Sequence, residues 1–499
     1  MQCFAAVLLL ALPWINPFAP GPSPGVLPLL FSWSCAAALL GLWGFQRSPL
    51  AWPVGRLVTV TAAAWLAVGL LSSLMGLFQY FGVGGNLLPW VNQTELGQAF
   101  ANLRQRNQFA SLTNMALAAL FWFALTASPG RFLQAGVFVA ACMLAVGNAS
   151  SSSRTGLVQL FLLCVLGWMW GVKYRPLALR MLVAAVLSYG VAVVVLPWVA
   201  GLDLSLYGLT ARLRAGDEAC VSRLTLWSNV LHLIAQKPWL GWGWGELDYA
   251  HYVTPYGGPR FCDILDNAHN LPLHLAVELG VPFAVLFCAG CAWWVQRQKP
   301  WRETDPVRQL AWSVLAVILL HSLLEYPLWY GPFQMAMGLC VVFLWRGVLA
   351  DTSDGGAKNK VSKKLWWHIL RAPLAIILIS FCVAAALEYR RVSQIYLPPE
   401  SRDAALRDDT LAKIRNAWLF TDQARFAELL LTPLTRDNAQ WTFDTATALL
   451  HYSPEPRVIE KVIESAVLLG RDDEAQAHLA HYRAAFPADH ARWAKANAR

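Results

Sequence analysis

Charged residues are scarce in this chain of 499 residues: they make up 14% of the sequence, whereas hydrophobic residues make up 57%. A soluble domain usually has about a quarter of its residues charged. The shortage therefore excludes an ordinary soluble globular protein. The sequence also lacks the ligand spacing of a zinc or calcium site. The Gly/Trp-rich stretch 241–245 lacks the Lys and Ser/Thr of a phosphate loop, so we interpret it as an interfacial turn with aromatic anchors.

Long apolar runs stand where the charges are missing. Segments such as 177–196, 310–324 and 374–386 are apolar on nearly every side of a helix, which suits lipid better than a half-buried position. Because a span needs roughly 20 apolar residues, we predict an all-α, polytopic membrane protein of about eleven transmembrane helices. The first segment lacks the basic start and the cleavage site of a signal peptide, so we interpret it as a helix. The predicted spans lie near 3–18, 26–45, 56–80, 108–127, 131–147, 156–172, 177–199, 271–295, 309–325, 328–349 and 368–388.

Basic residues alternate between the connections, which predicts the orientation by the positive-inside rule. Lys and Arg recur at 47–56, 131, 173–175, 297–308 and 346–364, so we place these connections in the cytoplasm. The connections 81–107, 148–155, 200–270 and 326–328, and the tail after 389, then face outward. This predicts a multi-pass protein of the bacterial inner membrane with its active site facing the periplasm. The formal net charge of +9 belongs to the membrane part, because residues 390–499 hold 15 basic and 15 acidic residues. We therefore expect no nucleic-acid partner.

Two parts of the chain are predicted to lie outside the bilayer. Residues 1–389 form a transmembrane helical body that includes a large periplasmic loop at 200–270. In that loop 222–236 is typical of an amphipathic helix, and Cys220 and Cys262 share an oxidising compartment in which a disulfide can form. Residues 390–499 form a soluble periplasmic tail. Its apolar residues return at helical spacing around Gly470, which resembles tetratricopeptide-type helix pairs, although a small helical bundle fits as well.

Polar clusters at the outer ends of apolar segments are candidate functional sites, because such residues are costly there. They lie at 104–107, 150–155, 223, 266–278 and 321–330. Arg154 and Arg223 face outward against the charge trend, and an arginine fork suits phosphate oxygens. Alternatively Arg154 snorkels behind capping serines, and Arg223 is merely solvated. His269 can take a proton near neutral pH, although a histidine at an interface is more often a structural cap.

These segments, in this order, resemble the O-antigen ligase, polymerase and protein O-oligosaccharyltransferase superfamily. The matching pieces are SSSSRTG at 150–156, SRLTLWSNVLHLIAQKPWLGWGWGEL at 222–247, DNAHNLPLHLAVELG at 266–280 and HSLLEYPLWY at 321–330. The stretches QRNQFA at 105–110 and HSLLEYPLWY look most like the branch that glycosylates pilin-type proteins. That branch often has His where this chain has Gln108.

The resemblance implies a glycosyltransferase of the membrane C-type class that needs neither metal nor cofactor. Its donor would be an undecaprenyl-diphosphate-linked glycan, and its acceptor a hydroxyl of a periplasmic, pilin-like protein. His269 would orient or deprotonate the acceptor, and Arg154 and Arg223 would hold the diphosphate. The remaining substrate-binding candidates are Gln105, Arg106, Asn270, Glu278, His321, Glu325 and Tyr326. Three other activities fit less closely: a lipid A-core O-antigen ligase, a repeat-unit polymerase, and a transporter of lipid-linked sugars.

Overall fold

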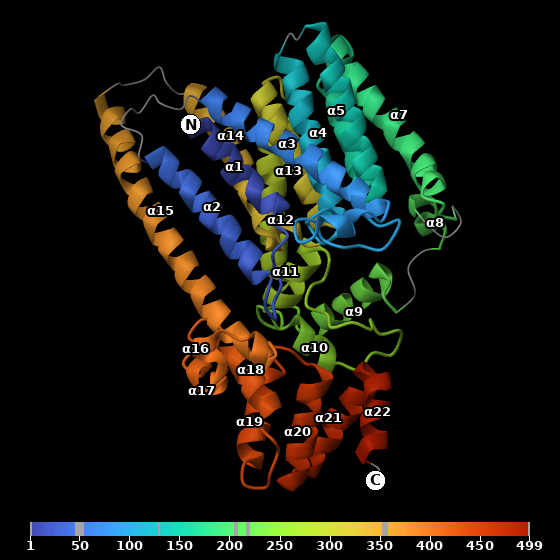
Figure 1. The fold of residues 1–499 in the computed structure, drawn as a ribbon, viewed down its shortest axis with the longest axis vertical. Helices are drawn as coiled ribbons and strands as arrows, with labels where there is room; N and C mark the ends of the chain where they lie inside the picture. Colours follow the sequence, from blue (N-terminus) through green and yellow to red (C-terminus); the bar gives the residue numbers. More distant parts are fainter. Residues whose placement is uncertain are drawn as a thin grey trace. The chain divides into compact units, whose positions relative to one another are not determined.

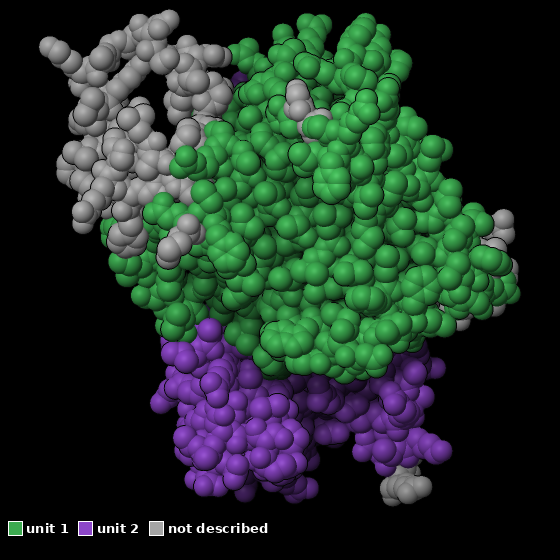
Figure 2. All heavy atoms as spheres, turned by 45° about the horizontal axis from the view of Figure 1, so that its top comes forward, with its two compact units in different colours: residues 1–216, 295–384 green, residues 217–294, 385–499 purple. Residues whose placement is uncertain are grey.

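The computed structural model describes residues 2–44, 54–127, 130–203, 208–215, 220–351 and 358–497 (Figure 1). Throughout these residues the regular structure is helical and no strand occurs, so the predicted all-α class is confirmed. The chain divides into two compact units, which Figure 2 colours separately. Unit 1 comprises Met1–Gly216 and Val295–Ala384, and unit 2 comprises Asp217–Trp294 and Ala385–Arg499.

Unit 1 is built from the apolar helices of both halves of the chain. Its elements are α1 (Gln2–Ile15), α2 (Val26–Gly44), α3 (Val54–Tyr80), η1 (Gly84–Leu87), α4 (Arg106–Thr126), α5 (Arg131–Ser150), α6 (Arg154–Met169), η2 (Val172–Tyr174), α7 (Pro176–Val199), α8 (Gly208–Ala215), η3 (Pro300–Arg302), α13 (Pro306–Ser322), η4 (Pro327–Trp329) and α14 (Gly331–Asp351).

Several of these helices can cross a membrane by length and composition. In the described residues five qualify: α4, α5, α7, residues Gly55–Tyr80 of α3, and Arg371–Tyr396, which covers the second half of α15 (Lys358–Ser393). Five shorter helices, α1, α2, α6, α13 and α14, are also apolar. These helices support a multi-pass membrane protein. The count of eleven spans stays a prediction.

Helix α4 is the buried centre of unit 1. It packs against α3, α5, α6, α7 and α13. Of the most apolar part of this helix, 83% is buried. Its polar residues Asn107, Ser111 and Asn114 are buried too. A polar side chain that faces protein can find hydrogen-bond partners that lipid does not offer. The burial of α4 therefore explains how an apolar helix carries a polar stripe.

One predicted span is not a single continuous helix. Residues 271–295 form two helices, α11 (Leu271–Leu279) and α12 (Val281–Gln298), because the backbone breaks at Gly280, where φ is 90°. A side chain on Gly280 would collide with the carbonyl of Trp239, and the N–H groups of Trp242 and Gly243 donate to the carbonyls of Val277 and Glu278 at 2.8 and 3.0 Å. The Gly/Trp-rich turn thus caps the end of α11, and the chain does not continue as one helix through residues 271–295.

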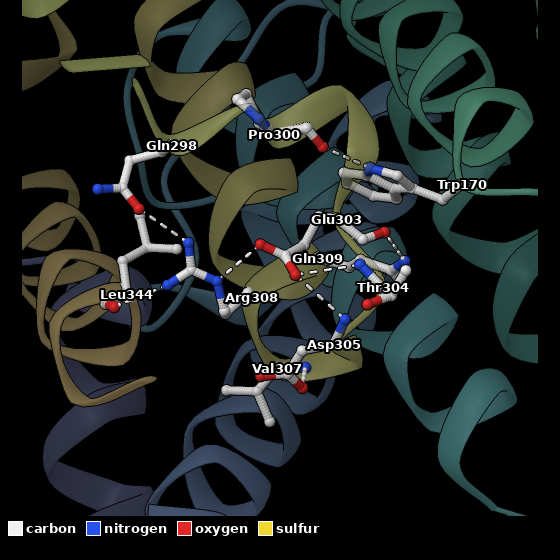
Figure 3. Close-up of polar contacts among 10 residues, drawn as sticks. All are labelled: Trp170, Gln298, Pro300, Glu303, Thr304, Asp305, Val307, Arg308, Gln309 and Leu344. Carbon is white, nitrogen blue, oxygen red and sulfur yellow. Dashed lines mark hydrogen bonds and ion pairs between the residues drawn. The ribbon is translucent and has the colours of Figure 1, made fainter. Parts of the chain in front are cut away.

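The connection between α12 and α13 is held by Arg308 (Figure 3). Its Nε lies 2.6 Å from Oε2 of Glu303, and both side chains are largely buried. Its Nη1 donates to the carbonyl of Leu344 at 2.8 Å, and its Nη2 to Gln298 Oε1 at 2.9 Å. One of the charges that predicted a cytoplasmic connection is therefore paired inside the protein.

Unit 2 combines the loop after α8 with the tail. Its elements are α9 (Arg223–Gln236), α10 (Leu247–Val253), α11, most of α12, the end of α15, η5 (Gln394–Tyr396), η6 (Pro399–Ser401), α16 (Ala404–Arg407), α17 (Thr410–Ile414), α18 (Thr421–Leu431), α19 (Ala439–Leu449), α20 (Pro456–Leu468), α21 (Asp472–Ala485) and α22 (Pro487–Asn497). Helix α9 confirms the predicted amphipathic helix. Cys220 and Cys262 form a disulfide with their Cα atoms 5.4 Å apart, as predicted.

The tail helices share a hydrophobic core with the loop. Val462, Ala466 and Tyr482 are fully buried in it, and Tyr252 of α10 belongs to the same cluster. Val467 is apolar but lies outside this core and is 57% exposed. Consecutive helices from α18 to α22 pack on one another. The tetratricopeptide-like character of the tail stays a prediction.

Candidate active site

The predicted site residues fall into both units. Unit 2 contains Arg223, His269, Asn270 and Glu278. Unit 1 contains Gln105, Arg106, Arg154, His321, Glu325 and Tyr326.

His269 stands at the start of α11 in a fixed backbone conformation. Its φ is 49°, in the left-handed region that is uncommon for a residue with a side chain. Its N–H donates to Asn267 Oδ1 at 2.9 Å, and the next residue, Asn270, caps α11 by accepting from the N–H of Leu273 at 3.0 Å. Both His269 and Asn270 are half-buried. Local hydrogen bonds on either side therefore hold the histidine at the mouth of the helix.

Two ionisable residues follow one face of α11 behind His269. His274 Nε2 lies 3.5 Å from Glu278 Oε2, and both side chains are buried. Burial lowers the pKa of His274 to about 4, and the neighbouring His269 adds to that shift. Burial also raises the pKa of Glu278 to about 7, although a hydrogen bond from the N–H of Gly245 acts to lower it. The two side chains thus form a buried contact in which burial favours the neutral form of each group.

Asp248 is a candidate that the sequence analysis missed. It lies in the first turn of α10. Burial, with smaller contributions from the charges of Glu246 and Asp266, raises its pKa to about 7. A carboxyl group with a raised pKa is a common feature of functional sites. The signal available in the sequence was weak: an acidic residue in a short, mostly apolar segment, outside any motif.

Arginine occupies the first position of three capped helices. Arg106 follows the cap Gln105 on α4, Arg154 follows Ser153 on α6, and Arg223 follows Ser222 on α9. A positive charge at a helix N-terminus opposes the helix dipole. A bound anion removes that conflict, because both the arginine and the free N–H groups favour negative charge. Each position therefore suits a phosphate oxygen.

The candidates after α13 are joined to α4 by buried hydrogen bonds. His321 is fully buried, and its Nδ1 lies 2.9 Å from Ser111 Oγ. Glu325 Oε1 accepts from Asn107 Nδ2 at 3.0 Å. Tyr326 is half-buried, and its ring stacks on Tyr330 with the centroids 6.0 Å apart. The structure thus brings the segments 105–111 and 321–330 together.

Ser111 and Gln159 also belong to this buried network but were not among the candidates predicted from the sequence, whereas Asn107 lies in the predicted cluster 104–107. Gln159 of α6 donates from Nε2 to Ser111 Oγ at 2.7 Å. The signal for α4 was present as a polar stripe, since Asn107, Ser111 and Asn114 follow the i, i+4, i+7 spacing of one helix face. Elsewhere, no group of three or more His, Cys, Asp or Glu residues in the described ranges is placed to hold a metal ion.

Known families match three parts of the chain. The family described as O-Antigen ligase matches residues 138–288, and that described as Virulence factor membrane-bound polymerase, C-terminal, matches residues 309–499. The family described as Protein glycosylation ligase matches residues 99–124.

A protein of Acinetobacter baylyi named General O-oligosaccharyltransferase is 25% identical over 349 residues, which are 66% of this chain and 59% of that protein. The chain is thus similar to the O-antigen ligase and O-oligosaccharyltransferase superfamily. A second superfamily member from the same organism, named ComP-specific O-oligosaccharyltransferase, is 25% identical over 250 residues, which are 49% of this chain and 43% of that protein. The matches span less than two thirds of either relative. Both come from the O-oligosaccharyltransferase branch of the superfamily, as predicted.

Proposed function

We propose that this protein transfers a glycan from an undecaprenyl-diphosphate carrier to a serine or threonine hydroxyl of a periplasmic, pilin-like protein. One observation carries the proposal. The segment matched by the O-antigen ligase family, 138–288, includes Arg154 and Arg223, each at the start of a capped helix, and His269 at the mouth of α11. The names of the two relatives support a protein acceptor.

In the proposed reaction the acceptor oxygen attacks the anomeric carbon of the first sugar. The bond between that carbon and the phosphate oxygen breaks, and its electron pair leaves with undecaprenyl diphosphate. The hydroxyl proton passes to the imidazole of His269, because histidine accepts protons readily near neutral pH. Arg154 and Arg223 stabilise the charge that develops on the diphosphate. Such stabilisation is commonly worth about 3–4 kcal/mol for a key donor, which supports a reaction that uses no metal and no cofactor.

The remaining candidates are proposed to bind substrate: Gln105, Arg106, Asn270, Glu278, His321, Glu325 and Tyr326. The proposed reaction requires a site on the periplasmic side of the inner membrane, where the lipid-linked glycan would meet a secreted acceptor.

The proposal is tested by expressing the protein in a host that makes one defined undecaprenyl-linked glycan. Pilin and lipid A-core are assayed separately for the attached glycan. Glycosylated pilin alone is the expected result. Glycan on lipid A-core alone would overturn the protein acceptor and favour the ligase alternative.

A polymerase is the second candidate, because the match at 309–499 is to a polymerase family. Its product would be a longer glycan on the lipid carrier, with neither acceptor modified. Electrophoresis of the carrier-linked glycan from the same cells separates this outcome from the first two.

A further inference from the structure

Buried hydrogen bonds connect Glu325 with the first turn of α6. Glu325 Oε1 accepts from Asn107 Nδ2 at 3.0 Å. Asn107 Oδ1 accepts from the hydroxyl of Ser153 at 2.6 Å. The Ser153 oxygen accepts in turn from the N–H of Gly156 at 2.9 Å. The side chain of Ser153 is fully buried, and Asn107 and Glu325 are less than a tenth exposed.

The direction of each bond in this chain is determined by chemistry. A backbone N–H only donates, so Gly156 takes a lone pair of Ser153 and the hydroxyl hydrogen is left for Asn107. The amide oxygen of Asn107 is then used, and its NH₂ group turns to Glu325, whose carboxylate only accepts. The opposite amide orientation would set the Asn107 oxygen against an oxygen of Glu325. The carboxylate at one end therefore determines where the Ser153 hydroxyl points.

The Ser153 hydroxyl controls the start of α6. It is the N-cap of the helix, and Arg154 is the first helical residue. One residue earlier, Ser152 has a φ of 51°, and its carbonyl accepts from Arg212 Nη1 at 3.0 Å. A side chain added at Gly156 would collide with Asn148 and Ala110. The backbone that carries Arg154 thus has little room to move once Ser153 is in place.

We propose that Asn107 and Ser153 are positioning residues that set the place of Arg154 at the diphosphate of the glycan donor. This inference rests on the proposed function, because that function assigns the diphosphate to Arg154. The hydrogen-bonded chain Glu325–Asn107–Ser153, called the relay below, orients a donor-binding group. It takes no part in the attack by the acceptor. Disturbing it raises the KM for the donor lipid and leaves the KM for the acceptor unchanged.

The decisive variants exchange the amide and the carboxylate. Asn107→Asp removes the donor and sets a second carboxylate against Glu325. We expect it to raise the donor KM at least about tenfold, since small misplacements of binding groups have effects of this order. In N107D/E325Q a glutamine NH₂ group donates to the new carboxylate, which still accepts from Ser153. The donor KM of this double variant should return to within about threefold of that of the Glu325→Gln variant, as expected for two coupled residues.

Two further variants separate positioning from general damage. Ser153→Ala removes the cap and should raise the donor KM, and Ser153→Thr keeps a hydroxyl and should largely restore it. Thr113→Val is the matched control. Thr113 lies on the same helix as Asn107, is 1% exposed, and donates to Ala110 O within its own helix. Its variant should keep the wild-type donor KM even if the protein becomes less stable.

The assays use the full-length protein in lipid nanodiscs, with an undecaprenyl-diphosphate-linked oligosaccharide and an acceptor polypeptide. The Kd for the donor alone is measured beside transfer, so that the two proposals are tested separately. A wild-type protein that binds donor but transfers to no acceptor contradicts the proposed function. An unchanged donor Kd in N107D, equal losses for donor and acceptor, or no recovery in N107D/E325Q contradicts the relay.

Discussion

The Nδ1 atom of His451, in the tail, lies 2.6 Å from Oε2 of Glu246, in the loop. The ring of Tyr249 stacks on the same histidine with the centroids 3.8 Å apart. Three residues further along the loop, Tyr252 is buried in the tail core, and its hydroxyl lies 3.1 Å from His478 Nδ1. Residues some 200 positions apart are thus joined in unit 2, and the tail supports the helix that carries Asp248.

This arrangement predicts that Tyr252→Ala and His451→Ala differ greatly in their effect on the free energy of unfolding. Tyr252→Ala leaves a cavity and should lower the free energy of unfolding of unit 2 by about 3–5 kcal/mol. His451→Ala breaks an exposed pair and should cost less than about 1 kcal/mol. Thermal unfolding and limited proteolysis of the full-length protein measure both. If Tyr252→Ala were as stable as His451→Ala, the tail would not hold α10 through this residue.

The pKa of Asp248 predicts a pH dependence of stability. Its value is raised from 3.8 to about 7 by burial, so the folded protein favours the protonated form. Its unfavourable contribution to stability is therefore absent below about pH 4, grows as the pH rises to about 7, and stays constant above that. The melting temperature of Asp248→Asn should therefore rise relative to that of the wild type as the pH is raised from 5 to 8.

Asp263→Asn is the matched control, because Asp263 lies exposed in the same loop. Its melting temperature should follow that of the wild type at every pH. A constant difference between Asp248→Asn and the wild type over this range would show that Asp248 keeps its ordinary pKa.

Apolar runs and caps were the features that the sequence predicted best. The all-α class and the helix after Ser222 follow from local patterns, and the cysteine pair follows from the predicted location of both residues in one oxidising compartment. The break at Gly280 does not, because it depends on a turn some forty residues earlier that packs against the end of α11. Ser111 was missed for a related reason: the role of a polar residue inside an apolar run depends on the helix that packs beside it. Asp248 could not be predicted because it belongs to no motif, and its raised pKa arises from burial in the folded loop.

The two proposed diphosphate ligands predict that charge alone is insufficient. Arg154→Ala and Arg223→Ala should each lower transfer by about 100- to 1,000-fold. Arg→Lys at either place keeps the charge but loses the paired donors, so it should still lose at least about tenfold. Steady-state transfer and donor binding are measured on the same preparations. Nearly full activity of both Lys variants would reduce the role of these arginines to general electrostatic attraction.

The most direct test of the central claim is the transfer rate of His269→Ala. Losing a general base typically costs about 100- to 10,000-fold in rate, so this variant should lose transfer while it inserts normally and binds donor lipid like the wild type. His274→Ala is the control on the same helix: His274 is 2% exposed, so its loss should reduce stability more than chemistry. Abolished transfer in His269→Ala at normal abundance is the predicted result. A near wild-type rate in His269→Ala, or a dead His274→Ala at normal abundance, would contradict the assignment of His269 as the base.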